Sequence, residues 1–176
     1  MKAHAVLPSP LGELTVVTDG EAVTGLYMTA HRHAPDHQSH GPRVEPDEGP
    51  AVLARTAAEL AAYFAGELCE FTVPVATRGT SFQERVWRGL RDIPYGRTWS
   101  YAQLADHIGA SGAARAVGLA NGRNPVSVIV PCHRVIGANG SLTGYGGGME
   151  RKRTLLALES RAPASAAGRG AQHLLF

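Results

Sequence analysis

The sequence is poor in cysteine and has no long apolar run. Cys69 and Cys132 are its two cysteines among 176 residues, too few for a disulfide framework or a four-cysteine zinc site. No apolar run approaches the ~20 residues of a membrane-spanning helix, and the first residues lack the apolar stretch of a secretory signal. We therefore expect a soluble, cytoplasmic protein with reduced thiols.

Charge is unevenly distributed along the chain. The net charge is +2. Residues 1–78 contain five Lys or Arg and ten Asp or Glu, giving −5, whereas residues 79–160 contain ten and five, giving +5. A basic half joined to an acidic half is typical of a protein in which one half meets a polyanion. The alternative is ordinary solvated surface charge.

The acidic half has the pattern of a small α/β domain. Residues 13–18 and 22–28 alternate around an Asp-Gly pair and predict a β-hairpin. Apolar residues recur at helical spacing over residues 51–65. We expect residues 1–78 to form an N-terminal domain, and no residue set in it indicates chemistry.

A His/Pro-rich loop near residues 29–50 lies between the hairpin and the helix, and we expect it to be mobile. Its histidines could bind a metal, but nothing in their spacing fixes a coordination geometry. They are His31, His33, His37 and His40.

The basic half begins with short helices. Ser81 and Glu84 stand at capping-box spacing and predict the start of the first, as Ser100 and Gln103 do for the second. A glycine-containing turn leads to a third helix, Ala113 to about Asn121. Two short helices joined in this way indicate a helix-turn-helix, although an ordinary helical hairpin gives the same pattern.

The third helix has a smooth surface with one long cation. A helix that reads base edges in the major groove carries several polar side chains, and this helix has few. Small residues allow close approach to a narrower groove, where a single Arg can enter the base stack. Helix–helix packing also favours small residues. The cation is Arg115, and its small neighbours are Ala113, Ala114, Ala116 and Gly118.

A cysteine followed by a histidine comes after the next apolar run. Val126 to Val130 predict a strand that ends at Cys132. A thiol reacts as the thiolate, which an adjacent His133 can promote near neutral pH. The alternative is a structural cysteine, because free cysteines are often buried as small apolar groups.

The chain closes with a glycine-rich loop and a helix. Glycines around Tyr145 allow a ligand to lie close to backbone N–H groups, but no Gly-Lys-Ser/Thr sequence marks a phosphate-binding loop. A basic amphipathic helix then ends at Glu159, and we expect residues 161–176 to be a flexible tail.

Taken together, these segments resemble a known family. The motifs SYAQLA, AARAVGLANGRNP, IVPCHRVIG, LTGYGGG and LLALE, spread over Gly79 to Glu159, resemble the O6-alkylguanine-DNA alkyltransferases, also called methylated-DNA–protein-cysteine methyltransferases. The resemblance implies an α/β protein with a small ribonuclease H-like N-terminal domain and a mainly helical second domain. It also implies DNA repair by irreversible, stoichiometric transfer of an alkyl group from O6-alkylguanine, and from O4-alkylthymine, to a cysteine after base flipping.

The resemblance assigns roles to the residues that match the family's motifs. It implies that Cys132 is the alkyl acceptor, that His133 takes its proton through a water, and that Glu159 orients the imidazole. Asn124 matches the family's hinge between the recognition helix and the active site, and Tyr101 matches the tyrosine that contacts N3 of the flipped guanine.

Further residues match the family's DNA contacts and substrate pocket. Arg115 resembles the finger that replaces the flipped base, and the small residues around it would face DNA. The backbone of Val135 and Gly146 would contact the guanine edge and O6, beside Tyr145 and Gly147.

Some positions depart from the family pattern. Some relatives have a hydroxyl residue where Gly146 stands, and Pro or Ala where Ser127 stands, so the tolerance of bulky adducts stays open. Neither Cys69 nor the His-rich loop matches the N-terminal zinc ligands of certain members. We expect no metal, no cofactor and no membrane partner. We expect a monomer that binds double-stranded DNA containing O6-alkylguanine.

Three other functions compete with repair. A damage sensor that binds lesions without repairing them would replace the motif cysteine, which is present here as Cys132. A thiol hydrolase would turn over and need no DNA. A sequence-specific regulator would need a recognition helix with more polar side chains.

Overall fold

The described part of the chain contains both halves of the sequence. The structure is a computed structural model and describes residues 1–142 and 144–161. The predicted tail, apart from Arg161, therefore lies outside the described residues. No helix in this part of the chain is long and apolar enough to cross a membrane.

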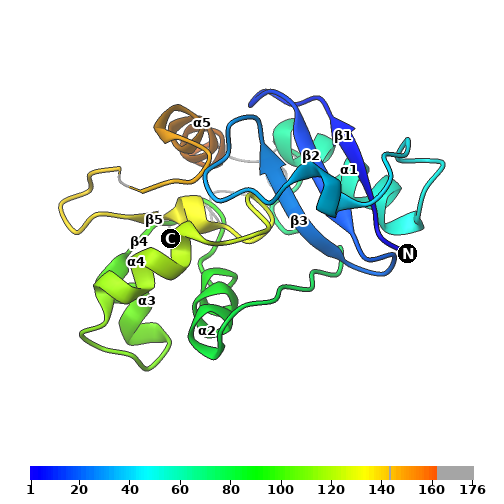
Figure 1. The fold of residues 1–176 in the computed structure, drawn as a ribbon. Coiled ribbons are helices and arrows are strands. Elements are labelled where there is room, and N and C mark those ends of the chain that lie inside the picture. The colour runs from blue at the N-terminus through cyan, green and yellow to red at the C-terminus, as the bar shows by residue number, and fades with distance from the viewer. Residues whose placement is uncertain (143, 162–176) are drawn as a thin grey trace.

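The N-terminal half is a sheet covered by a helix (Figure 1). Strands β1 (Ala3–Leu7), β2 (Leu14–Thr18) and β3 (Val23–Met28) form an antiparallel sheet in that order. Helix α1 (Ala51–Phe64) packs against all three strands. The predicted hairpin and helix are confirmed, but the sequence analysis missed β1, which is short and alternates only small or aliphatic buried residues with His4 and Val6.

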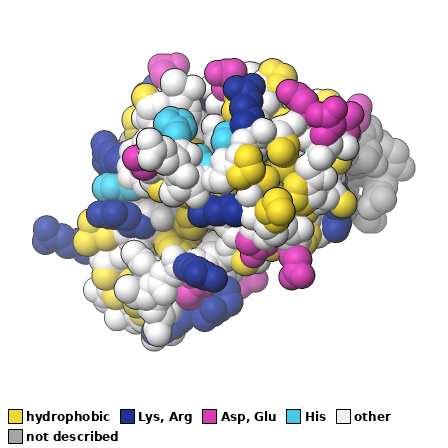
Figure 2. All heavy atoms as spheres, turned by 45° about the vertical axis from the view of Figure 1, so that its right-hand side comes forward, with side chains coloured by type: hydrophobic (Ala, Val, Ile, Leu, Met, Phe, Trp, Pro, Cys, Tyr) yellow, Lys and Arg dark blue, Asp and Glu magenta, His cyan; other side chains and the backbone are white. Residues whose placement is uncertain are grey.

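The His/Pro-rich loop runs back along the sheet. It contains the short helix η1 (His37–His40), and then pairs with β1, where His4 N donates to Pro42 O and Val44 N donates to His4 O, each over 2.9 Å. Figure 2 shows histidine side chains together on one face of the molecule. Over residues 1–142 and 144–161, no group of three or more His, Cys, Asp or Glu side chains is arranged to hold a metal ion.

The second half is mainly helical, as predicted. Helices α2 (Ser81–Leu90), α3 (Tyr101–His107) and α4 (Ala114–Gly122) all pack against one another. Residues 108–113 form the glycine-containing turn between α3 and α4. The indole of Trp87 in α2 donates to Ala120 O in α4 over 2.9 Å. The elements are α2 (Ser81–Leu90), β4 (Trp99–Ser100), α3 (Tyr101–His107), α4 (Ala114–Gly122), η2 (Cys132–Arg134), β5 (Val135–Ile136) and α5 (Met149–Glu159), with β4 and β5 paired in parallel.

One predicted capping box is one residue out of place. Helix α2 is capped by Thr80, whose hydroxyl accepts from Gln83 N, while the Gln83 side chain accepts from Thr80 N. The prediction of Ser81 and Glu84 was wrong because Thr80 and Gln83 offer the same spacing. Glu84 instead accepts from the Thr77 hydroxyl. The box of Ser100 and Gln103 at the start of α3 is confirmed.

The predicted strand from Val126 to Val130 is also wrong. All five residues are buried, but they form a tight turn with Val128 at a φ of 73°. Val126 makes a single parallel bridge to Leu26 at the end of the run nearest β3. A short apolar run shows burial without showing its backbone shape. The turn is therefore bridged to the N-terminal sheet at Val126, and Cys132 follows it after Pro131.

Candidate active site

Cys132 lies at the start of η2 with its thiol buried. The residue is 4% exposed. Burial raises the pKa of the Cys132 thiol, while hydrogen bonds from the Asn124 and Ser127 side chains and the charge of Lys152 oppose that rise. These neighbours stabilise the thiolate rather than the thiol. The thiol is therefore protected from solvent, and its polar neighbours offset part of the effect of burial on its pKa.

Asn124 connects the end of α4 to the turn before Cys132. Its Nδ2 donates to Val130 O over 2.8 Å, and its Oδ1 accepts from Val126 N over 3.0 Å. Both contacts are buried, so the amide spans the turn from the inside. This is the bridging position that the resemblance assigned to Asn124.

The imidazole of His133 is oriented by a carboxylate. Its Nε2 lies 2.7 Å from Oε2 of Glu159, and both side chains are buried. An ionised carboxylate only accepts, so Nε2 carries the proton and Nδ1 is the basic nitrogen. Nδ1 is buried and has no hydrogen-bond partner among the described residues. A base with one nitrogen held and the other unsatisfied is ready to accept a proton.

Arg134 completes the carboxylate's surroundings, which the sequence analysis did not foresee. Its Nε donates to Oε1 of Glu159 over 2.8 Å, its Nη2 to Oε2 over 3.0 Å, and its Nη1 to Ile93 O over 2.7 Å. Burial alone would raise the pKa of Glu159, but the charge and hydrogen bond of His133 and the bonds from Arg134 hold that pKa well below its usual range. Glu159 is therefore ionised at neutral pH.

Lys152 is a second buried cation that the sequence analysis missed. It is 0% exposed, and its Nζ donates to Val135 O over 2.6 Å. Burial lowers the pKa of Lys152 to about 8, and Cys132 opposes this effect. A signal was present in the sequence, because Lys152, Leu155 and Glu159 are spaced i, i+3, i+7 and form the buried face of α5.

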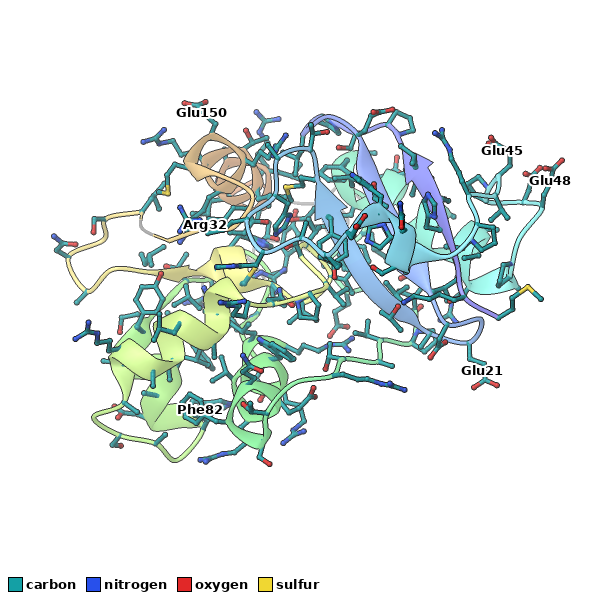
Figure 3. The ribbon with its side chains drawn as sticks, viewed as in Figure 1. Glu21, Arg32, Glu45, Glu48, Phe82 and Glu150 are labelled. Atoms are coloured by element: carbon teal, nitrogen blue, oxygen red, sulfur yellow. The ribbon has the colours of Figure 1, made fainter. Side chains whose placement is uncertain are left out.

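The glycine-rich loop contacts the N-terminal domain closely. A Cβ on Gly147 would lie 2.5 Å from Met28 Sδ, and one on Gly146 would lie 3.0 Å from His31 Nε2. Arg32 N donates to Gly146 O over 2.8 Å, and Figure 3 places Arg32 between the sheet and the C-terminal helices. In this structure the glycines make room for N-terminal residues. Backbone groups of Val135 and Gly146 were predicted to contact guanine. In this structure the carbonyl of each accepts one hydrogen bond, from Lys152 Nζ and from Arg32 N.

Helix α4, predicted to be the recognition helix, presents the predicted cation to solvent. Arg115 and Ala116 are exposed, and Ala113, Ala114 and Gly118 are partly exposed. Gly118 lies against Tyr101 at the start of α3, since a Cβ there would be 3.6 Å from the Tyr101 ring. Tyr145 is buried, and Cys132 and Ser127 both act on its pKa, so it lies near the thiol.

Known protein families match both halves of the chain. The family model described as 6-O-methylguanine DNA methyltransferase, ribonuclease-like domain, matches residues 3–77. The one described as 6-O-methylguanine DNA methyltransferase, DNA binding domain, matches residues 81–161. A protein of Mycobacterium bovis named methylated-DNA–protein-cysteine methyltransferase is 54% identical over 162 residues, which are 92% of this chain and 94% of that protein.

Solved structures give the same relationship. The crystal structure of the Mycobacterium tuberculosis O6-methylguanine methyltransferase is 51% identical with a TM-score of 0.84, covering 97% of this chain and 100% of that one. A crystal structure of Mycobacterium tuberculosis OGT in complex with DNA is 53% identical with a TM-score of 0.83, covering 93% of this chain and 97% of that one. The likeness therefore extends over both domains and is not confined to the cysteine motif.

Proposed function

The chain belongs to the 6-O-methylguanine DNA methyltransferase family, and we propose that it repairs DNA by moving an alkyl group from O6-alkylguanine onto its own Cys132. The observation that supports this most directly is the geometry beside the thiol. Glu159 fixes Nε2 of His133 as the protonated nitrogen, and Nδ1 has no hydrogen-bond partner among residues 1–142 and 144–161. A buried cysteine with a poised base suits nucleophilic chemistry.

The proposed reaction is an SN2 displacement at the alkyl carbon. Cys132 gives its proton to Nδ1 of His133 through a bridging water. The thiolate sulfur then forms a bond to the alkyl carbon, and the bond from that carbon to O6 breaks with its electron pair staying on guanine. Guanine takes up one proton, which balances the one lost by the thiol. The thioether is stable, so each molecule reacts once.

Two further groups help the base to leave the duplex and react. Tyr101, the first residue of α3, donates a hydrogen bond to N3 of the guanine. The leaving base therefore does not carry a full negative charge. Arg115 fills the gap in the base stack. Flipping costs a few kcal/mol, less where alkylation has weakened pairing. Alkylated duplex DNA is thus the partner, and O4-alkylthymine is a second substrate of the same pocket.

The protein's cellular setting follows from its thiols and its partner. We propose a cytoplasmic monomer that associates with the nucleoid when it binds DNA. Neither Cys69 nor Cys132 forms a disulfide in the described part of the chain, which fits a reducing compartment. Fractionation of cells that produce the protein would test this location.

Mass spectrometry after incubation with an O6-methylguanine duplex tests the function directly. We expect one added CH2 unit per protein molecule, mapped to the peptide that contains Cys132. A damage sensor would bind the duplex without any mass change, and a thiol hydrolase would turn over without a stable adduct. A regulator would instead prefer one fixed sequence over other unmodified duplexes.

Arg115→Ala should separate the base-stack role from a simple phosphate contact. We expect repair of methylated duplex DNA to fall about tenfold or more, while reaction with free O6-methylguanine base, which needs no flipping, stays near the wild-type rate. If Arg115 only contacts a phosphate, the variant should bind more weakly, with a salt slope reduced by about one, and repair should recover at saturating protein. Equal slowing on base and duplex would contradict both roles.

A further inference from the structure

The N-terminal domain contributes a polar side chain to the active-site cluster. Tyr63 in α1 is fully buried, and its hydroxyl donates a hydrogen bond of 2.5 Å to Oε2 of Glu159. The two residues are 96 positions apart in sequence. The bond joins α1 to Glu159, the last residue of α5, so it is a direct link between the two domains at the group that orients His133.

Oε2 of Glu159 is crowded with donors. It accepts from the Tyr63 hydroxyl, from His133 Nε2 at 2.7 Å and from Arg134 Nη2 at 3.0 Å. One carboxylate oxygen offers about two lone-pair directions, so these donors compete. The strength of any one bond therefore depends on whether the other two are present.

We propose that Tyr63 is a positioning residue for alkyl transfer, and that its hydroxyl holds the Glu159 carboxylate so that His133 donates from Nε2 and keeps Nδ1 as the base for Cys132. The proposal rests on the proposed transfer to Cys132. Tyr63 reaches no reacting atom itself and acts through Glu159. The N-terminal domain thereby takes part in setting the basicity of a group in the other domain.

The charges around His133 determine the direction of the effect. Burial lowers the pKa of His133, Glu159 raises it, and Arg134 and Lys152 lower it further. The Tyr63 hydroxyl is neutral, because burial and the nearby carboxylate raise its pKa. Without this donor, more of the carboxylate's charge acts on His133, so the pKa of His133 rises. The titratable or charged groups around His133 are Cys132 and Arg134 in η2, Lys152 and Glu159 in α5, Tyr63 in α1, Tyr95 beyond α2, and Tyr145 in the glycine-rich loop.

The test is the pH dependence of single-turnover transfer from a methylated duplex to Tyr63→Phe. The reaction needs neutral His133, so a raised pKa should move the acidic limb of the rate profile upward by about one pH unit. On the alkaline side the variant and the wild type should converge. A loss of packing alone would lower the rate equally at every pH.

Tyr95→Phe is the matched control. It removes the same atom from a neighbouring ring, 6.2 Å from the Tyr63 ring, and the Tyr95 hydroxyl has no hydrogen-bond partner within the described chain. Its acidic limb should not move. Replacing Tyr63 by 3-fluorotyrosine keeps the ring and the hydroxyl but makes the hydroxyl a stronger donor, so this protein should show the opposite shift even if Tyr63→Phe folds poorly.

The outcomes distinguish the positioning role of Tyr63 from alkyl transfer to Cys132. An adduct on Cys132 with an unshifted limb in both altered Tyr63 proteins would overturn the positioning role and leave alkyl transfer intact. An equal shift in Tyr95→Phe would overturn it as well. No adduct on the wild-type chain would overturn alkyl transfer itself, and the role of Tyr63 with it.

Discussion

Cys132→Ser is expected to abolish alkyl transfer completely while leaving DNA binding unchanged. A serine hydroxyl is not ionised near neutral pH and is a far weaker nucleophile than a thiolate. It has nearly the same volume, and it would lie beside Asn124 and Ser127, the side chains that hydrogen-bond the thiol. The fold should therefore survive, with a change in the free energy of unfolding within about 1 kcal/mol. Adduct formation by mass spectrometry and duplex binding by titration check both halves of the prediction.

Cys69→Ser is the control for that experiment. Cys69 is the second cysteine of the chain and is half-buried in the segment after α1. It lies outside the IVPCHRVIG motif in the sequence and is not the predicted acceptor, so its loss should leave the amount and the site of the adduct unchanged. Transfer by the Cys69 variant at the level of the Cys132 variant would refute the assignment of the acceptor.

Local patterns in the sequence predicted most of the fold. Caps and periodicity placed the helices, and alternation placed the hairpin, because these features depend on neighbouring residues. The run Val126–Val130 was mistaken for a strand because a buried turn and a buried strand are similarly apolar in sequence. The turn depends on contacts with the N-terminal sheet, which lies far away in the sequence. Family resemblance predicted Cys132, His133 and Glu159, and the structure brings the last two into contact.

The missed residues all depend on tertiary contacts. Arg134 was counted with the basic surface that meets DNA, yet it is 6% exposed and pairs with Glu159. Lys152 was counted only as one of the cations of a basic amphipathic helix, and it is buried. Tyr63 lay in a helix with no expected chemistry. Net charge by sequence half therefore overestimates the basic surface, because two of its cations act inside the site.

Glu159→Gln should cause a large loss of stability, about 3–5 kcal/mol in the free energy of unfolding. Glu159 accepts from Tyr63, His133 and Arg134, and an amide NH2 would face one of these donors. Arg134 would also keep its buried charge without a counter-ion. The variant that still folds should transfer about 100-fold more slowly, because the tautomer of His133 is no longer fixed.

The pH dependence of unfolding gives a second measure of the same carboxylate. The pKa of Glu159 is depressed in the folded state, so its contribution is fully present above the unfolded value of about 4.3 and is lost as the pH falls through the folded pKa. Urea unfolding of the wild type should therefore show stability falling below about pH 4.3, with part of that slope missing in Glu159→Gln.

Glu150→Gln is the matched control at the other end of α5. Figure 3 shows Glu150 pointing away from the molecule, and its side chain is 94% exposed with a 3.3 Å contact to Arg153. An exposed pair of this kind contributes about 0–1 kcal/mol, so the control should unfold close to the wild type and keep its acid dependence. Equal stability of the two variants at neutral pH would mean that Glu159 contributes no more than a surface carboxylate, and that His133 is held in place by packing instead.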